Sequence, residues 1–233
     1  MAEWCVTVLI FHHVSPDLDY YTNTPPAIFR SQIAALADEF EFLTVREAHR
    51  AFLSGEPADR RVVLTFDDGY KDNFLFALPV LKDFGIKATF FILPEFAGRM
   101  NEWNQKCGYR TPHLSWHEVD ALLAEGHEIA SHGLLHAPFT QLSLPEVERE
   151  LRVSKKMIQE RIGVPPSSFS FPYGMTNREV SGLAAAHYDV ALSTVKSSET
   201  DWFKGRHALR RTYIPVDAEP PRILAIVNGE ARL

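Results

Sequence analysis

Cysteine is scarce in this chain of 233 residues, which contains Cys5 and Cys107 alone. Two thiols allow at most one bridge, so the small disulfide-rich scaffolds of secreted proteins are excluded. Cys5 stands in an apolar segment that is typical of a buried strand, and we expect both cysteines to be free thiols. The fold must rest on a hydrophobic core, which a chain of this length with 45% hydrophobic residues can build.

Long apolar runs and clusters of basic residues are also missing. No segment approaches the roughly 20 apolar residues that cross a bilayer, so we expect no transmembrane segment. The first residues lack a basic leader and a cleavage site, which predicts a cytoplasmic protein if the chain starts at its native Met1. A formal net charge of -6 without Lys or Arg clusters argues against nucleic-acid binding. The sequence gives no indication of oligomeric state.

Short apolar runs alternate with helical patterns along the chain. This alternation is typical of an α/β fold with a mainly parallel sheet, in which strands are covered on both faces. The expected strands are 5–11, 61–66, 87–92, 127–131, 167–171, 188–193 and 209–214. The expected helices are 26–40, 44–54, 71–84, 115–125, 145–162 and 176–187. Because no repeat or linker divides the pattern, we expect one domain over residues 1–233.

Local signals mark several helix ends. Thr24 before two prolines predicts a cap and a first helical turn, and Ser115 with Glu118 forms a capping box. Glycines that follow helical runs, where a left-handed terminating residue is favoured, are Gly85, Gly126 and Gly163. The irregular segment 94–112 has the length of a functional or disordered loop. Its Trp103 and Tyr109 could stack on sugar rings or anchor the loop to the core.

The segment RVVLTFDDGY carries the strongest chemical signal, because a buried strand ends there in Asp67 and Asp68. Active sites of parallel βα folds gather at the carboxyl ends of strands. Adjacent carboxylates repel one another, so keeping both ionised favours a nearby cation. Asp-Asp-Gly is equally good turn chemistry, and the tripeptide alone leaves both interpretations open.

Histidines supply the second signal, in the segment SHGLLHAP after an expected strand. His132 and His136 stand four residues apart, so on one helical turn both imidazoles could bind one metal ion. His113 and His117 share this spacing, but the Ser115 cap lies between them. We interpret that second pair as surface or helix-start residues, with a role at the substrate as the alternative.

Two further strand ends complete the set of candidates. SFSFPYG ends a strand in a sharp turn that could aim the Tyr173 amide at a ligand. FHHV places His12 and His13 after the first strand. Because side chains alternate along a strand, only one of these two histidines should face the cleft.

The four segments together resemble the polysaccharide N-deacetylases of carbohydrate esterase family 4, which include chitooligosaccharide and exopolysaccharide deacetylases. The resemblance runs from about Val8 to Ile214, and TFDDGY is its most specific motif. It implies a distorted (β/α)7 barrel with mainly parallel strands, in agreement with the expected strands. It also implies a hydrolase that removes acetyl groups from an N-acetylated saccharide, either an oligosaccharide or polysaccharide or a glycan precursor.

The resemblance assigns a role to each matching residue. Asp67 corresponds to the catalytic base, and Asp68, His132 and His136 correspond to the ligands of a divalent metal ion. Zinc is the first expectation for this ion, and cobalt or nickel are alternatives. Tyr173 corresponds to the residue whose backbone amide helps to hold the oxyanion.

The sequence departs from the family pattern at three places. Gly133 follows His132 where the family usually has a Ser or Thr hydroxyl that can brace the site. Ser170 stands where an Arg usually orients the catalytic Asp, and we hypothesise that Arg210 or Arg211 supplies that charge. The C-terminal Leu-x-x-His segment that usually brings the general acid is missing.

The missing general acid directs attention to the first strand. His207 is the one histidine near the C-terminal end, and it lacks the pattern. LIFHHV resembles an N-terminal element of the biofilm exopolysaccharide deacetylases, with Phe11 in place of Tyr. This likeness predicts His12 as the general acid, with His13 as the alternative. Two rival functions remain, a carbohydrate-binding relative without turnover and a metal-dependent phosphoryl hydrolase, although no Gly-rich phosphate loop with a Lys is present.

Overall fold

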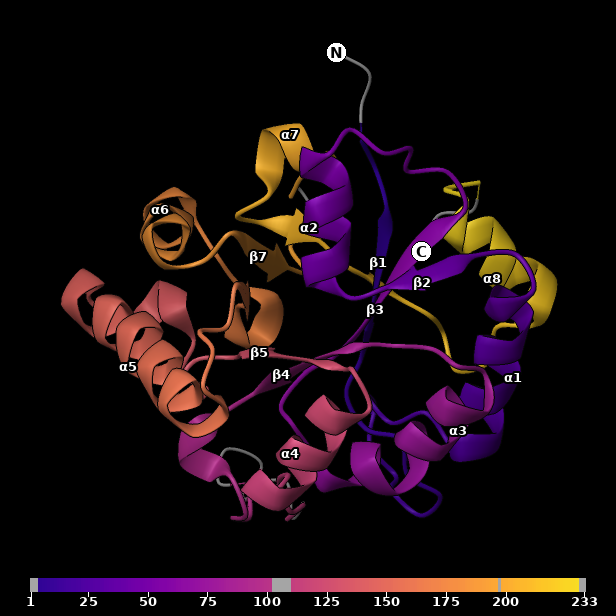
Figure 1. The fold of residues 1–233 in the computed structure, drawn as a ribbon, viewed down its shortest axis with the longest axis horizontal. Coiled ribbons are helices and arrows are strands. Elements are labelled where there is room, and N and C mark those ends of the chain that lie inside the picture. The colour runs from indigo at the N-terminus through magenta and orange to yellow at the C-terminus, as the bar shows by residue number, and fades with distance from the viewer. Residues whose placement is uncertain (1–3, 102–109, 197, 231–233) are drawn as a thin grey trace.

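The strands form one parallel sheet that curls into a barrel, with helices around it (Figure 1). The structure is a computed structural model that describes residues 4–101, 110–196 and 198–230. Around the sheet the strands follow in the order β8 (Leu209–Arg210), β7 (Val190–Ser193), β6 (Ser168–Ser170), β5 (Glu128–Ser131), β4 (Thr89–Ile92), β3 (Arg61–Phe66), β1 (Thr7–Phe11) and β9 (Thr212–Tyr213). Outside this path, β2 (Glu41–Leu43) pairs with β3.

One short segment closes the barrel because both edges of the sheet belong to it. β8 pairs with β7, with Leu209 opposite Leu192, and β9 pairs with β1, with Thr212 opposite Leu9. Arg211 alone separates β8 from β9, so the segment Leu209–Tyr213 acts as one barrel strand, here called the closing stave. With β1, β3, β4, β5, β6 and β7, this stave makes seven positions, which confirms the expected distorted (β/α)7 barrel of mainly parallel strands.

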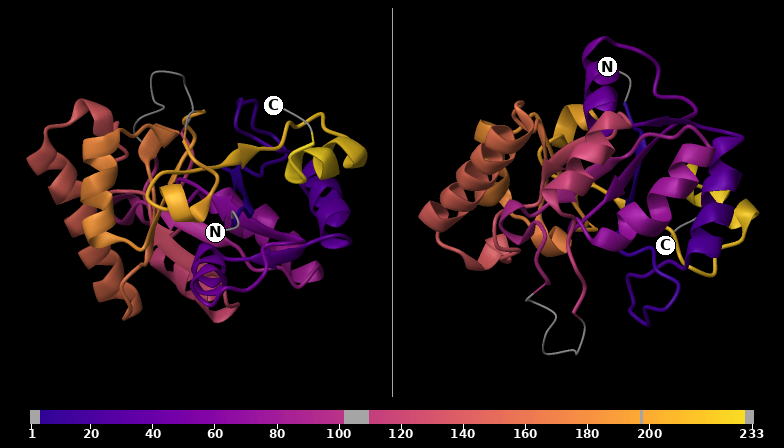
Figure 2. Two further views of the ribbon diagram at one scale, coloured as in Figure 1. Left: turned by 90° about the horizontal axis from the view of Figure 1, so that it is seen from above. Right: turned by 60° about the horizontal axis from the view of Figure 1, so that its bottom comes forward.

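The helices cover the outside of the barrel. They are α1 (Pro26–Ala37), α2 (Val45–Leu53), α3 (Leu78–Asp83), α4 (Trp116–Ala124), α5 (Leu144–Ile162), α6 (Arg178–His187), α7 (Trp202–Gly205) and α8 (Pro220–Val227). α1 and α8 lie together on one side of the molecule, and α5 and α6 lie together on the opposite side (Figures 1 and 2). Among the helices of the described residues, none combines the length and hydropathy needed to cross a membrane.

The helix-end signals are confirmed at most positions. Ser115 and Glu118 form the expected capping box at α4, and Gly85, Gly126 and Gly163 all have positive φ. Thr24 as the cap of α1 is wrong, because Pro25 holds that position and the Thr24 N–H bonds to the carbonyl oxygen of His13.

Other differences from the expected elements have local causes. The expected helix 71–84 is divided into a π-helical turn, Asn73–Ala77, and α3. Pro79 lacks the N–H that would continue the α-helical ladder there. The expectation that Cys5 is buried is wrong, because Trp4 and Val6 point inward and the alternation exposes Cys5 between them. Cys107, Trp103 and Tyr109 lie outside the described residues.

The amino end of the barrel is filled by a buried polar network around Glu128, at the start of β5. Its carboxylate accepts hydrogen bonds from the Arg46 N–H at 2.8 Å, the Thr89 hydroxyl at 2.9 Å and the Ser168 hydroxyl at 2.8 Å. Burial nevertheless raises the pKa of Glu128 above its ordinary value. The cavity of the structure lies at the opposite, carboxyl end of the strands, where Asp67, His12 and His132 line it.

Candidate active site

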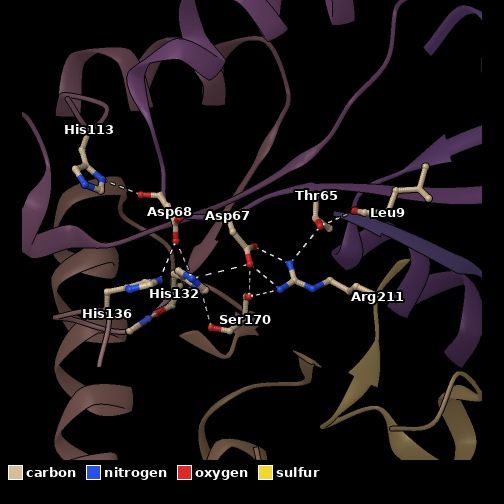
Figure 3. Close-up of polar contacts among 11 residues, drawn as sticks. Leu9, Thr65, Asp67, Asp68, His113, His132, His136, Ser170 and Arg211 are labelled. Atoms are coloured by element: carbon tan, nitrogen blue, oxygen red, sulfur yellow. Dashed lines mark hydrogen bonds and ion pairs between the residues drawn. The ribbon is translucent and has the colours of Figure 1, made fainter. Parts of the chain in front are cut away.

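The carboxyl ends of the strands bring the expected polar side chains into one cavity (Figure 3). Asp67 and Asp68 follow β3, His132 follows β5, and His12 follows β1. The Asp67 N–H bonds to the Phe11 carbonyl oxygen at 3.0 Å, which sets the end of β3 beside the end of β1. The cavity is lined by Asp67, Asp68, His12, His132, His136, Tyr173 and Arg211, together with Tyr20, Tyr21, Tyr70 and Tyr213 among others.

Asp68, His132 and His136 form a cluster that could hold a metal ion. Asp68 Oδ1 lies 3.1 Å from His132 Nε2 and 3.1 Å from His136 Nε2. The three residues are buried, and their candidate ligand atoms all lie within 4.8 Å of one another. One carboxylate oxygen and two imidazole nitrogens are a donor set that suits zinc and similar transition metals. The residues present therefore fit the expected ion.

The orientation of His132 is fixed from behind by a backbone group. His132 Nδ1 lies 2.8 Å from the carbonyl oxygen of Ser170. Because a carbonyl only accepts, a proton belongs on Nδ1. Nε2 then faces Asp68, to which it donates when the ring is protonated, and the neutral ring offers the Nε2 lone pair to a metal ion. Burial would lower the pKa of His132, but the charge of Asp67 and the hydrogen bond to Asp68 raise it above its ordinary value.

The prediction that His132 and His136 share one helical turn is wrong. These residues form a loop, in which Gly133 has a φ of 87° and His136 a φ of 53°. A left-handed residue at each end turns the chain back on itself, so the two imidazoles face the same carboxylate without a helix. The ring centroids lie 5.2 Å apart.

Asp67 is held by a buried arginine. Arg211 donates from Nη1 to Asp67 Oδ1 and from Nη2 to Asp67 Oδ2, both at 2.6 Å, and from Nη2 to Ser170 Oγ at 2.8 Å. The Ser170 hydroxyl in turn donates to Asp67 Oδ2 at 3.0 Å. Of the two candidate arginines, Arg211 is thus the one brought to Asp67, while exposed Arg210 bonds to the Lys196 carbonyl oxygen.

This arrangement keeps Asp67 ionised inside the protein. Burial would raise the pKa of Asp67, but Arg211 and the nearby histidines hold it below its ordinary value. The bidentate geometry also fixes the plane of the carboxylate. Asp67 Oδ2 lies 3.9 Å from His132 Nε2, so an ionised and oriented carboxylate lies next to Asp68, His132 and His136.

The two histidines after β1 face different surroundings, as the strand alternation predicts. His12 lines the cavity, and its ring lies parallel to that of Tyr213, with centroids 5.8 Å apart. Burial lowers the pKa of His12, although Asp68 and Asp67 act to raise it. His13 instead bonds through Nδ1 to Asp72 Oδ2 at 2.6 Å and does not line the cavity.

Tyr173 lies beside the metal cluster in an unusual backbone conformation. Its φ of 59° and ψ of 9° are left-handed, and its ring centroid lies 4.6 Å from that of His136. Three of the four non-glycine residues with positive φ in the described chain line this cavity, namely Asp68, His136 and Tyr173. Such conformations persist only where the surroundings enforce them, and they gather at functional sites.

His113 corrects the sequence interpretation, because it is buried rather than a surface residue. Its Nδ1 lies 2.8 Å from the Asp68 carbonyl oxygen, so this ring supports the left-handed turn at Asp68. Burial lowers the pKa of His113 to about 4, which keeps the ring neutral, and the carbonyl acceptor places its one N–H on Nδ1. The position before a helix cap gave no signal of this contact.

Beside Tyr173, which the sequence identified, the cavity is lined by Tyr20, Tyr21 and Tyr213, which the sequence analysis missed. Tyr20 and Tyr21 come from the segment between β1 and α1, which projects from the lower edge of the molecule in the right-hand view of Figure 2. Tyr21 is 85% exposed, Tyr173 52% and Tyr213 42%, so their rings are accessible to a ligand. The doubled tyrosine after FHHV is the sequence signal that could have identified this wall.

Comparisons with known proteins agree on one family. A family model described as polysaccharide deacetylase matches residues 54–191. A putative polysaccharide deacetylase of Bacillus subtilis, YxkH, is 27% identical over 212 residues, 89% of this chain and 70% of that protein. The peptidoglycan-N-acetylglucosamine deacetylase PgdA of Listeria monocytogenes is 30% identical over 123 residues, 52% of this chain but 23% of that protein.

A solved structure agrees with the fold. The deacetylase PplD of Streptococcus pyogenes, in complex with acetate, superposes with a TM-score of 0.83 and 22% identity, over 96% of this chain and 98% of that chain. The expected barrel is therefore shared along almost the whole length of the chain. Since the family model covers more than half of its residues, the chain belongs to the polysaccharide deacetylase family.

Proposed function

We propose that this protein hydrolyses the N-acetyl group of a saccharide, with a divalent metal ion held by Asp68, His132 and His136. One observation carries the proposal. In a barrel of the deacetylase family, the candidate metal ligands Asp68, His132 and His136 lie in the same cavity as the Asp67–Arg211 ion pair. A binding protein without turnover has no need for a buried carboxylate that a bidentate arginine keeps ionised and oriented.

Asp68, His132 and His136 would hold the ion, which would supply Lewis-acid chemistry toward the acetyl oxygen and a water molecule. Zinc is the first candidate, and cobalt and nickel suit the same donor set. The protein's own contribution is to fix the ligands, because His132 is oriented by the Ser170 carbonyl and Asp68 by His113. Mutations of such supporting partners commonly weaken metal binding by about 10- to 100-fold.

Asp67 acts as the general base in this mechanism. The oxygen of the attacking water bonds to the acyl carbon while one of its protons passes to the Asp67 carboxylate. Arg211 and Ser170 hold that carboxylate in place. Oδ2 accepts bonds from both residues, whereas Oδ1 accepts one bond from Arg211 and retains a lone pair that can take the proton. Arg211 is thus a positioning residue, which takes over from the arginine missing at Ser170.

His12 acts as the general acid, and Tyr173 supports the developing charge. As the C–N bond breaks, the protonated His12 ring gives its proton to the departing nitrogen, so acetate and a free amino sugar result. The Tyr173 backbone N–H donates to the oxygen that gains negative charge. Because burial lowers the pKa of His12, its protonated fraction falls early as pH rises, which predicts activity that declines toward alkaline pH.

The substrate class is an N-acetylated saccharide, either an oligosaccharide or polysaccharide or a glycan precursor. The similarity to a polysaccharide deacetylase and to a peptidoglycan-N-acetylglucosamine deacetylase supports this class. Exposed aromatic rings at the cavity mouth support it too, since tyrosine faces stack well on sugar rings. Trp103 stays a further candidate for such a contact, as a prediction from the sequence.

The test measures acetate released from N-acetylglucosamine oligomers by metal-stripped protein that is resupplied with Zn²⁺, Co²⁺ or Ni²⁺. We expect metal-dependent release, and we expect Asp67→Asn to lower it by about 10²- to 10⁴-fold, the usual contribution of a general base. Arg210→Gln, which changes an exposed neighbour of Arg211, is the control. Tight metal binding without acetate release would contradict the proposal and favour a relative that binds saccharides without turnover.

A further inference from the structure

A buried carboxylate outside the metal cluster contacts the loop that carries two of its members. Glu150 lies on α5, and its side chain points inward with the residue 4% exposed. Its Oε2 accepts hydrogen bonds from the Leu134 N–H at 2.7 Å and from the Leu135 N–H at 3.1 Å. These are consecutive amides in the middle of the loop from His132 to His136. One carboxylate oxygen therefore holds the segment between the two imidazoles.

The position of Glu150 is rigid because α5 is well anchored. The neighbouring helix residues Val147 and Leu151 are fully buried. Ser154, one turn further along, donates from Oγ to the Glu150 carbonyl oxygen at 2.6 Å and also contacts the Ser131 hydroxyl at 2.9 Å. Since Ser131 ends β5 and directly precedes His132, the helix is tied to the strand immediately before the loop. Glu150 therefore holds the loop at a fixed position relative to α5.

Gly133 shows how closely the carboxylate approaches the loop. A Cβ atom at this position would lie 3.2 Å from Glu150 Oε2 and 3.4 Å from Phe139, and φ is 87°. A residue with a side chain would be strained in that conformation and would crowd the carboxylate. Gly133 therefore removes a possible hydroxyl brace next to His132 and at the same time makes room for Glu150.

The burial of the Glu150 carboxyl group requires compensation. Among the described residues, the hydrogen bonds and ion pairs of this side chain are the two with the loop amides, and neither involves a Lys or Arg. A buried carboxylate is costly unless hydrogen bonds and a nearby positive charge compensate it. The two loop amides supply hydrogen bonds, and a cation held by the loop's histidines would supply positive charge nearby.

We propose that Glu150 is a positioning residue for the metal centre, which sets the loop geometry so that His132 and His136 converge on Asp68. The inference rests on the proposed function in requiring that the cluster binds a metal ion. Glu150 takes no part in the reaction itself. Its effect is on how tightly, and in what geometry, the ion is held.

The experiment compares metal binding rather than turnover. Metal-stripped wild type, Glu150→Ala, Glu150→Gln and Glu146→Ala are titrated with Co²⁺, whose visible absorption reports the ligand geometry, and with Zn²⁺ in competition with a chelator. Glu146→Ala is the matched control, because Glu146 belongs to the exposed capping box that starts α5 and does not contact the loop. Unfolding by urea measures the loss of stability in each variant.

We expect Glu150→Ala to weaken Zn²⁺ binding by about 10-fold or more and to change the Co²⁺ spectrum, as loss of a supporting partner usually does. Glu150→Gln, which keeps an acceptor oxygen without the charge, should fall between Glu150→Ala and wild type. Glu146→Ala should lose stability without losing affinity. If Glu150→Ala does not fold, Glu150→Gln decides, with a weakening of about 3-fold expected.

Wild-type affinity and an unchanged Co²⁺ spectrum in a folded Glu150→Ala, or in Glu150→Gln when the alanine variant is unfolded, would overturn the role of Glu150. Equal losses of affinity in Glu150→Ala and Glu146→Ala would overturn it as well, because they would show a general effect of α5 stability. Failure of the wild type to bind Co²⁺ or Zn²⁺ is a separate result, which would refute the metal site of the proposed function itself.

Discussion

Replacing Arg211 with Gln tests the central pair of the site. Arg211 is fully buried at its side chain and makes two hydrogen bonds of 2.6 Å to Asp67, so Arg211→Gln leaves a buried carboxylate without its positive partner. Breaking a buried pair in this way costs about 3–5 kcal/mol of unfolding free energy. Arg210→Gln removes an equal charge one residue away at an exposed position and should change stability by about 0.5 kcal/mol or less.

The assay pairs urea unfolding of both variants with acetate release under saturating metal and substrate. Arg211→Gln should lower kcat by about 10²-fold or more, the lower range for a misdirected general base, while Arg210→Gln keeps wild-type kcat. Asp67→Asn combined with Arg211→Gln should be less destabilised than the sum of the two single variants, because the contact is counted twice in the singles. Arg211→Gln as stable and active as Arg210→Gln would refute the reasoning.

Three further predictions follow from the same geometry. Asp68→Asn and His136→Ala should each abolish tight Zn²⁺ binding in calorimetric titration. Retained affinity in both variants would show that Zn²⁺ binds at another site. Tyr21→Ala should raise KM for an oligosaccharide without lowering kcat, with Tyr21→Phe close to wild type, whereas an unchanged KM would exclude the ring from binding. Because burial raises the folded-state pKa of Glu128, the unfolding free energy should fall as pH rises from about the ordinary value of 4.5 through that raised pKa. Glu128→Gln should lack this decline in urea titrations across pH, and parallel profiles would contradict it.

The sequence predicted the site residues that directly follow apolar strands. Continuous apolar runs predict buried parallel strands, and polar residues directly after them, such as Asp67 and His132, must gather at one end of the barrel. The match of TFDDGY to its family then identified the cluster before its geometry was known. This part could be predicted because side-chain alternation, and polar residues placed directly after an apolar run, are properties of the local sequence.

Other parts depend on contacts between distant segments. His136 reaches Asp68 through a left-handed loop that Glu150 holds, and neither feature is encoded in a four-residue spacing. Alternation shows that Arg210 and Arg211 point to opposite faces, but only the register of the closing stave decides which face is inside. The short strand β2 and helix α8 were missed because three residues give no periodicity and Pro220 begins a helix where no further element was expected.

The division of the closing stave around Arg211 has a consequence for how the enzyme matures. Asp68, His132 and His136 all precede residue 137. Arg211, which orients Asp67, lies 144 positions after Asp67 in the sequence. Contacts across so long a separation carry the largest loop-closure entropy and form late in folding. A partly folded chain can therefore bring Asp68, His132 and His136 together before Arg211 orients Asp67. Under the proposed mechanism, hydrolysis would then begin only when the barrel closes, and a partly folded molecule would not turn over substrate.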